Sequence, residues 1–510
     1  MGLRDIIKRK EEANGLTTKG MYFGKAEAEG ENLEGADLIA YFKDDLNILN
    51  KIAQDKFIIT GRKGVGKSAI AKFINESAIK ESDSYASLVK IYDLGLETKI
   101  QGTQDFYDKH VIEWLILVKI SKLIISSRDG QYTDEYEKLK DFLDLNSGVV
   151  EIDKLQLTGT IINSLNSIKF GPLQELAVKL KLAKKQTFIK PEFYTIIPAL
   201  REVVQRFLEF PVVQKNEYWI MFDDLDVNFS VHDKSHVRRI GDMIRLAKEY
   251  NTNYLRKTKT RVLIFLRDDI RDEVGKPTDL AKVLTSYEAE IRWFTKQDYR
   301  NDEEFLIPLK QLANRRIKTA FETVSKASYN QIDPWNSLIK NKLYRDRAWK
   351  VPKSPFKYVL DFTFFRPRDI VTFLSVISEQ NFKLPLSKHN VDIVLKDYKR
   401  LIVRELKSEL AIKFTEYEIE VIVEDIIPYV TDYNPLFEDL LEELKGYKWE
   451  KFDSYQIMRE LYRYSIIGFR NDDDNTIYFS FRTNVMGFEK LSANQDLSII
   501  TPKILNHIYF

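Results

Sequence analysis

The chain has 510 residues and an almost balanced charge, with 79 Lys and Arg against 77 Asp and Glu. It contains no cysteine, which excludes disulfide bonds, thiolate catalysis and cysteine-based zinc sites. A chain of this length exceeds one compact core, so we expect roughly three or four units of domain size.

The chain lacks the sequence features of an exported or membrane protein. Its first residues, MGLRDIIKRKEE, are charged and have no apolar core, so we expect no signal peptide. The most apolar stretch, Val111–Ile125, is interrupted by Glu113, Lys119 and Lys122, which favours a buried helix over a membrane span. We therefore expect a cytoplasmic protein without a membrane partner.

Three short apolar runs stand out along the first 300 residues: KFIIT at 56–60, YWIMF at 218–222 and RVLIFL at 261–266. Runs without alternation are typical of strands that are buried on both faces of a parallel sheet. Helical periodicity lies between the runs, for example at 67–80 and 106–125. The alternation of strands and helices predicts an α/β fold with a parallel sheet.

A glycine-rich segment, Gly61–Ser68, separates the first run from the following helix and reads G-R-K-G-V-G-K-S. It matches G-x-x-x-x-G-K-[ST], the pattern of a phosphate-binding loop. In such a loop backbone N–H groups hold the phosphates, the lysine reaches the β- and γ-phosphates, and the hydroxyl ligates Mg²⁺. We therefore predict a site for ATP and Mg²⁺, with Lys67 and Ser68 in these two roles. The predicted nucleotide-binding residues are Gly61, Arg62, Lys63, Gly64, Val65, Gly66, Lys67, Ser68 and Ala69.

Acidic residues follow the second apolar run as Asp223-Asp224-Leu225-Asp226. We predict that Asp223 holds Mg²⁺, directly or through water. A second acid is needed to polarise the attacking water; Asp224 is the first choice and Asp226 the alternative. An ordinary Asp-rich turn is the structural alternative for the whole motif. The long separation between Ser68 and Asp223 predicts a largely helical insertion at about 100–210.

Arginines at two later positions are further candidates. Arg267 ends the third run, where it would sense the γ-phosphate in its own subunit or reach a neighbour's site as an arginine finger; a capping salt bridge is the alternative. In Phe364-Phe365-Arg366-Pro367-Arg368-Asp369-Ile370, Pro367 predicts a helix start. Arg368 would then lie in the first turn, where the helix dipole disfavours a cation, so it is a candidate for contacting nucleotide.

The order of these motifs resembles the AAA+/STAND branch of P-loop ATPases. It is similar to origin-recognition-type ATPases and to bacterial P-loop ATPases found near phage-defence genes. The resemblance implies a lid whose second sensor arginine is Arg368, with Arg366 where glycine is usual. It also implies an adenine-wrapping segment at Phe23, and Asp224 in the place of the usual Glu. Relatives of this kind often end in a winged-helix domain.

The resemblance and the periodicity together predict four parts. They are a lead-in at 1–50, an ATPase core at 51–300, a helical lid and linker at 301–415, and a winged-helix-like domain at 416–510. Within the third part we expect a loop at Val351–Phe356. Within the last part we expect a helix at Ser454–Tyr464 and then a hairpin with a polar tip.

The charges of the C-terminal half bear on its partners. Residues 416–447 hold ten acids and one Lys, which favours a protein partner over nucleic acid. Cations and aromatic residues interleave at Lys340–Lys353, which suits nucleic acid, and further cations lie at 396–404, as Lys396, Lys399, Arg400 and Arg404. A solvated helix face is the alternative for both stretches.

The function that we expect is an ATP-driven switch. It would transmit its nucleotide state to a protein partner or effector, and the resemblance suggests antiphage defence. A DNA-remodelling ATPase and a scaffold that binds ATP without hydrolysing it are the alternatives, and a homo-oligomer is a further possibility for each.

Overall fold

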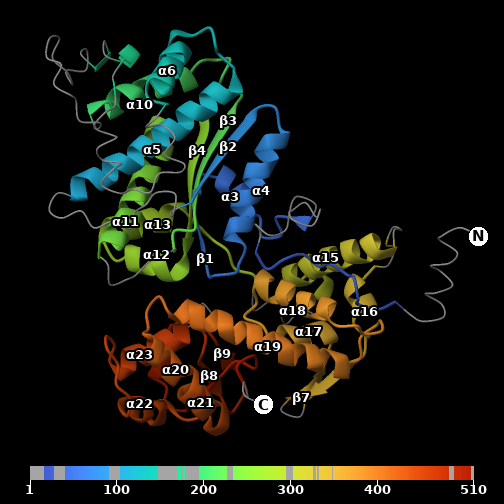
Figure 1. The fold of residues 1–510 in the computed structure, drawn as a ribbon. Coiled ribbons are helices and arrows are strands. Elements are labelled where there is room, and N and C mark those ends of the chain that lie inside the picture. The colour runs from blue at the N-terminus through green and yellow to red at the C-terminus, as the bar shows by residue number, and fades with distance from the viewer. Residues whose placement is uncertain are drawn as a thin grey trace, which may run out of the picture. The chain divides into compact units, whose positions relative to one another are not determined.

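A computed structural model of the chain shows two compact units (Figure 1). One is Asn47–Ile291, called the sheet unit below; the other, the helical unit, combines Met1–Leu46 with Arg292–Phe510. The structure describes residues 16–27, 41–90, 104–147, 169, 171–173, 176–177, 195–226, 234–294, 303–325, 329, 332–346, 349–481 and 487–506. Across these ranges, no helix has both the length and the apolar character needed to span a bilayer.

A five-stranded parallel sheet forms the centre of the sheet unit and confirms the predicted α/β fold. Its order is β2-β3-β4-β1-β5, so β4 separates β1 from β3. The strands are β1 (Ile58–Gly61), β2 (Ser84–Lys90), β3 (Glu217–Asp223), β4 (Lys259–Arg267) and β5 (Glu288–Glu290). The three apolar runs of the sequence are β1, β3 and β4, which lie in the middle of the sheet and are covered on both faces.

Helices cover the two faces of the sheet. Helix α4 (Lys67–Lys80), which occupies its predicted residues, packs against β1 to β4. In Figure 1 it lies on one side of the sheet, whereas α5 (Gln104–Ser127) and α11 (Lys234–Glu249) lie on the other. Helix α12 (Asp268–Val274) packs against α11, β4 and β1. The neighbouring strands β1 and β4 therefore lead into helices on opposite faces of the sheet.

The described part of the predicted insertion is helical. Helices α6 (Asp134–Leu145) and α10 (Ile197–Leu208) pack against α5, and α5 packs against β2 and β3. A further helix, α13 (Thr278–Tyr287), connects α12 to β5. The insertion thus extends the helical layer on one face of the sheet.

The helical unit has one continuous core that runs from Met21 to Leu505. Its first half contains α15 (Pro308–Ser325), α16 (Pro334–Leu338), β6 (Tyr344–Asp346), β7 (Trp349–Lys353), α17 (Pro355–Leu360), α18 (Pro367–Glu379) and α19 (Lys388–Leu410). Its second half contains α20 (Glu416–Val421), α21 (Ile427–Tyr433), α22 (Phe437–Lys445), α23 (Ser454–Arg463), β8 (Gly468–Asn471), β9 (Ile477–Tyr478), α24 (Phe488–Ser492) and β10 (Leu497–Ile500).

The described residues of Lys340–Lys353 form no helix, so the alternative of a solvated helix face is wrong for this stretch. Strands β6 and β7 pair as an antiparallel ribbon, with Tyr344 opposite Lys353. Pro352 lies inside β7, where its ring and missing N–H exclude a helix interior but are tolerated in an edge strand. The next helix, α17, begins at Pro355, capped by the hydroxyl of Ser354, which accepts from the Lys357 N–H at 3.2 Å.

The C-terminal hairpin is confirmed. Strands β8 and β9 pair antiparallel after α23, and β10 adds to the other edge of β8. Three strands beside α22 and α23 are compatible with the winged-helix prediction, which stays a prediction. The hairpin tip carries Asp472, Asp473 and Asp474, so its charge remains unsuited to contact with phosphates.

Candidate functional site

The Gly61–Ser68 loop connects the carboxyl end of β1 to the first turn of α4. Gly66 has φ +100° and is the residue before the helix, a conformation that only glycine adopts readily. At Gly61 a Cβ atom would lie 2.8 Å from Cγ2 of Val65 and 3.2 Å from the carbonyl oxygen of Ile291. Glycine is therefore required once for backbone conformation and once for close approach, as the sequence motif suggests.

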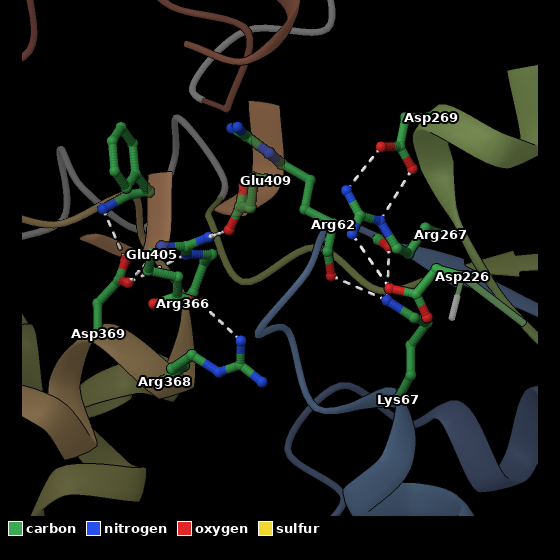
Figure 2. Close-up of polar contacts among 12 residues, drawn as sticks. Arg62, Lys67, Asp226, Arg267, Asp269, Arg366, Arg368, Asp369, Glu405 and Glu409 are labelled. Carbon is green, nitrogen blue, oxygen red and sulfur yellow. Dashed lines mark hydrogen bonds and ion pairs between the residues drawn. The ribbon is translucent and has the colours of Figure 1, made fainter. Parts of the chain in front are cut away.

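The lysine of the loop folds back onto its own backbone. Lys67 Nζ donates to the carbonyl oxygens of Gly61 at 2.8 Å and of Arg62 at 3.0 Å (Figure 2). Burial and the nearby guanidinium of Arg267 lower the pKa of Lys67, while the charge of Asp226 has the largest opposing effect. The ammonium group is thus held inside the loop, where Asp226, Asp268 and Asp223 offset its positive charge.

Ser68 and Asp223, the two predicted Mg²⁺ ligands, lie together. Ser68, in the first turn of α4, lies near enough to the carboxylate of Asp223 at the end of β3 for its hydroxyl to favour the charged form of that acid. Asp223 is only 2% exposed. Burial, and next the charge of Asp224, raises the pKa of Asp223 to about 6. The carboxylate is charged at neutral pH at a free-energy cost that a cation would relieve.

These two side chains fit a magnesium ion. Oδ2 of Asp223 is buried and has no hydrogen-bond partner among the described residues, so it keeps an unused acceptor. Carboxylate and hydroxyl oxygens are hard ligands that suit Mg²⁺, which usually takes one or two from protein and the rest from water and phosphate. Over the described ranges no group of three or more His, Asp or Glu could hold a metal. The ion would therefore depend on nucleotide phosphates for its remaining ligands.

The acid that sequence reasoning ranked first turns away from β1. Asp224 has φ +56° and pairs with Lys90, with 3.1 Å between Nζ and Oδ2. Lys90 ends β2, which β3 and β4 separate from β1. Asp224 therefore leans toward the edge of the sheet opposite to the Gly61–Ser68 loop. The sequence did not indicate Lys90 as the partner of Asp224, because β2 has no continuous apolar run.

Asp226 lies on the side of β3 that faces β4. Arg267 at the end of β4 donates a hydrogen bond to Oδ2 of Asp226 at 3.1 Å. It donates two further hydrogen bonds to the carboxylate of Asp269, at 2.7 and 3.0 Å (Figure 2). Gly61 is the register partner of Arg267 across the β1–β4 pair. Arg267 thus places Asp226 next to the strand that leads into the loop. The geometry agrees with the salt-bridge alternative for Arg267, whose side chain is almost fully buried.

The two arginines that flank Pro367 have different environments in the helical unit. Arg366 is 3% exposed and binds Asp369 at 2.8 Å and Glu409 at 2.8 Å (Figure 2). Its guanidinium also lies over the ring of Phe364. It is a structural residue that joins α18 to α19. Arg368, as predicted, lies in the first turn of α18, and its Nη1 donates to Glu405 of α19 at 2.5 Å.

Phe23 belongs to the core of the helical unit. Its side chain is 1% exposed, and its carbonyl oxygen accepts from NH1 of Arg316 at 2.9 Å. Packing accounts for this ring without a ligand. Contacts of Phe23 with adenine and of Arg368 with phosphate therefore stay predictions.

Comparison with known proteins adds no assignment: neither family models nor curated protein sequences match this chain. The site is consequently defined by its own residues.

The raised pKa of Asp223 predicts a pH-dependent effect of Asp223→Asn on stability. Folding raises this pKa from 3.8 to about 6, so the native state gains stability from the proton at low pH and loses it as the pH rises through 6. Without nucleotide and in the presence of a chelator, the free energy of unfolding of Asp223→Asn should exceed that of the wild type by roughly 1–3 kcal/mol above about pH 7. Its advantage should shrink below about pH 5.

Urea unfolding at several pH values measures this difference. Asp141→Asn, at an exposed position on α6, is the matched control and should behave as wild type throughout. A difference between Asp223→Asn and wild type that is constant with pH would contradict the buried, costly carboxylate.

The environment of Arg366 predicts that Arg366→Ala destabilises the helical unit. The substitution leaves the carboxylates of Asp369 and Glu409 buried without their cation, which costs about 3–5 kcal/mol. Arg400→Ala, which removes a solvent-exposed pair with Asp397 at 3.3 Å, should cost less than about 1 kcal/mol. If urea unfolding gave the same loss in the free energy of unfolding for the two variants, the ion pairs of Arg366 would not be structural.

Proposed function

We propose that the sheet unit binds ATP with Mg²⁺ at the Gly61–Ser68 loop and hydrolyses it. The observation that carries the proposal is the proximity of Ser68 to Asp223, which brings the loop after β1 next to the acid at the end of β3. This junction lies at the carboxyl ends of the strands, where β1 and β4 send their helices to opposite faces. Ligands of open α/β sheets bind at such a point.

The phosphate groups would take the place of the loop's own carbonyls as partners of Lys67. No side chain of the described residues caps the first turn of α4, and no acid lies in that turn. The backbone N–H groups and the positive end of the helix dipole therefore suit an anion. Nucleotide binding would turn Lys67 Nζ from Gly61 and Arg62 toward the β- and γ-phosphates, while the bound ion would neutralise developing charge.

Asp226 is better placed than Asp224 to polarise the attacking water. The charge of Asp226 is the largest acidic influence on Lys67, and its partner Arg267 lies beside β1. Asp224 is paired with Lys90 on the far side of β3. Arg267, held by Asp269, would act within its own subunit by orienting Asp226 rather than as an arginine finger for a neighbour.

The wider role that we propose is an ATP-driven switch of the AAA+/STAND type, which passes its nucleotide state to a protein partner. The acidic surface of the C-terminal part supports a protein partner over DNA in that region. Antiphage defence and a homo-oligomeric state rest on the resemblance. A scaffold that binds ATP without turnover is distinguished by the measurements below.

Lys67→Ala should weaken ATP binding at least about 100-fold, since a charge-assisted contact to two phosphates is lost. Isothermal titration with Mg-ATP measures the affinity. Lys80→Ala, at an exposed position in the last turn of the same helix, should bind ATP as wild type does. An unchanged affinity in a folded Lys67→Ala protein would refute the nucleotide site.

Asp226→Asn should lower kcat about 100-fold or more with little change in ATP affinity, because Asn keeps the acceptor for Arg267 but cannot serve as the base. Asp224→Asn should lower kcat less than about tenfold. Phosphate release under saturating ATP gives both values. The reverse ranking would assign the base to Asp224, and wild-type binding without any release would favour the scaffold.

A further inference from the structure

One face of α19 is exposed over its central turns, whereas the opposite face lies in the core of the helical unit. Positions three or four residues apart share a helix face. Ile393 is 37% and Leu401 is 38% exposed, so the helix presents apolar surface beside its charged side chains. We call this the basic face of α19, and its members are Ile393, Lys396, Asp397, Arg400, Leu401 and Arg404.

The basic face carries more positive charge than its own carboxylate neutralises. Arg400 pairs with Asp397, with 3.3 Å between Nη1 and Oδ1. Among the described residues, no carboxylate lies within ion-pair distance of Lys396 or Arg404. Three of the four cations that the sequence singled out at 396–404 therefore meet on one exposed helix face.

A second surface of the helical unit is rich in tyrosine. Tyr429 and Tyr433 of α21 contact each other, with 5.3 Å between ring centres. Tyr433 is 73% exposed, and Tyr417 of α20 is 56% exposed. Tyr447 follows α22, and its ring centre lies 6.2 Å from that of Trp449. Exposed tyrosines supply large contact areas at protein interfaces, so this surface suits a protein partner.

Acids lie among these tyrosines. Burial, and then the charges of Glu443 and Asp439, raises the pKa of Tyr429. Burial, and then the charges of Asp425 and Glu443, raises the pKa of Tyr447, whose hydroxyl donates to Oε1 of Glu443 at 3.4 Å. Among the described residues, no cation lies within ion-pair distance of these three acids. We call the three acids and the four tyrosines around them, at 417, 429, 433 and 447, the acidic face.

The two faces adjoin each other. Lys407, in the last turn of α19, pairs with Glu424 at 3.7 Å. Glu424 precedes Asp425 in a short helix, η8 (Ile422–Ile426), which connects α20 to α21. Lys407 lies three residues after Arg404 and hence on the same side of α19. The surface of the helical unit is thus positive along α19 and negative from η8 to α22.

We propose that two copies of the chain associate through this surface, with the basic face of each against the acidic face of the other. Neighbouring regions of opposite charge are self-complementary when a second copy is turned by 180°, which is the geometry of a two-fold dimer. The cations of α19 would meet carboxylates and also tyrosine rings, whose faces attract cations.

A second copy is the partner that the chain's own residues specify. The acidic face requires a partner with cations and some apolar surface, and the basic face offers both on a single helix. A solvated helix would account for the cations alone, whereas association would also cover Leu401, Tyr417 and Tyr433. The proposal does not depend on nucleotide binding at the Gly61–Ser68 loop, because both faces belong to the helical unit.

Charge reversal tests this contact in the full chain without nucleotide. In sedimentation equilibrium, the wild-type mass should approach twice that of the monomer over roughly 1–100 μM protein, and added salt should lower it. Lys396→Glu with Arg404→Glu makes both faces acidic, whereas Asp425→Lys with Glu443→Lys makes both basic. Each double variant alone should therefore have a dimer dissociation constant at least about tenfold higher than that of the wild type.

Mixing the two reversed variants provides the decisive measurement. An equimolar mixture should associate again, because each variant now carries the charge that the other requires. Asp141→Lys with Asp144→Lys reverses two exposed acids on α6 of the sheet unit, so it is the matched control and should associate as wild type does.

The proposal is overturned if the wild type stays monomeric, if the reversed variants associate as the control does, or if their mixture stays monomeric. A mass that keeps growing beyond the dimer would contradict the two-fold arrangement. A monomeric wild type whose acidic face binds a peptide of lysine and arginine would assign that face to a different protein and overturn the proposal as well.

Should a reversed variant fail to fold, cross-linking replaces it, since the chain has no cysteine of its own. Arg400→Cys and Glu443→Cys are mixed and treated with a short thiol cross-linker. They should form the mixed dimer at least about tenfold faster than Arg400→Cys mixed with Asp141→Cys, because association raises the local concentration of the two thiols. Equal rates for the two mixtures would refute the contact between the faces.

Discussion

The buried ammonium group of Lys67 is the constraint on which the proposed site depends. It sits beneath the glycine-rich loop, and among the described residues no carboxylate contacts it directly, so backbone carbonyls and three acids at some distance share its stabilisation. The neighbouring positive charge of Arg267 would make this arrangement unfavourable by itself. Asp226 and Asp269, which bind Arg267, balance it. The order of the strands makes this possible, because β4 brings Arg267 between the loop and the acids of β3.

A comparable balance holds the helical unit together, but with full burial and direct contacts. Arg366 is enclosed by Asp369 and Glu409, so its charge is compensated within one layer of side chains.

The sequence predicted the elements whose signal is local. The runs that became β1, β3 and β4 are continuous because both faces of these strands are covered, and the glycines of Gly61–Ser68 reflect backbone geometry within one loop. The edge strand β2 alternates irregularly, and β5 has two Glu in three residues, so neither showed a pattern. The ribbon at 344–353 was missed because its spacing of cations resembled a helix face, although Pro352 argued against one.

Pairings between distant segments were beyond prediction from one sequence. The choice between Asp224 and Asp226 depended on which neighbouring strand each faces, and that follows from strand order rather than from the motif. The role of Arg366 likewise depended on Glu409, which lies on another helix. Motif reasoning found the residues with chemical capacity, whereas the sheet and helix packing decided which of them meet.

The left-handed backbone at Asp224 has a consequence for how this site can change. Aspartate and asparagine tolerate a positive φ better than glutamate, for which this conformation costs roughly 1–2 kcal/mol. Replacing Asp224 with glutamate would therefore strain the turn after β3 instead of simply extending a carboxylate. The main-chain geometry therefore favours a short side chain at this position, and a longer acid would require a different backbone conformation in the turn.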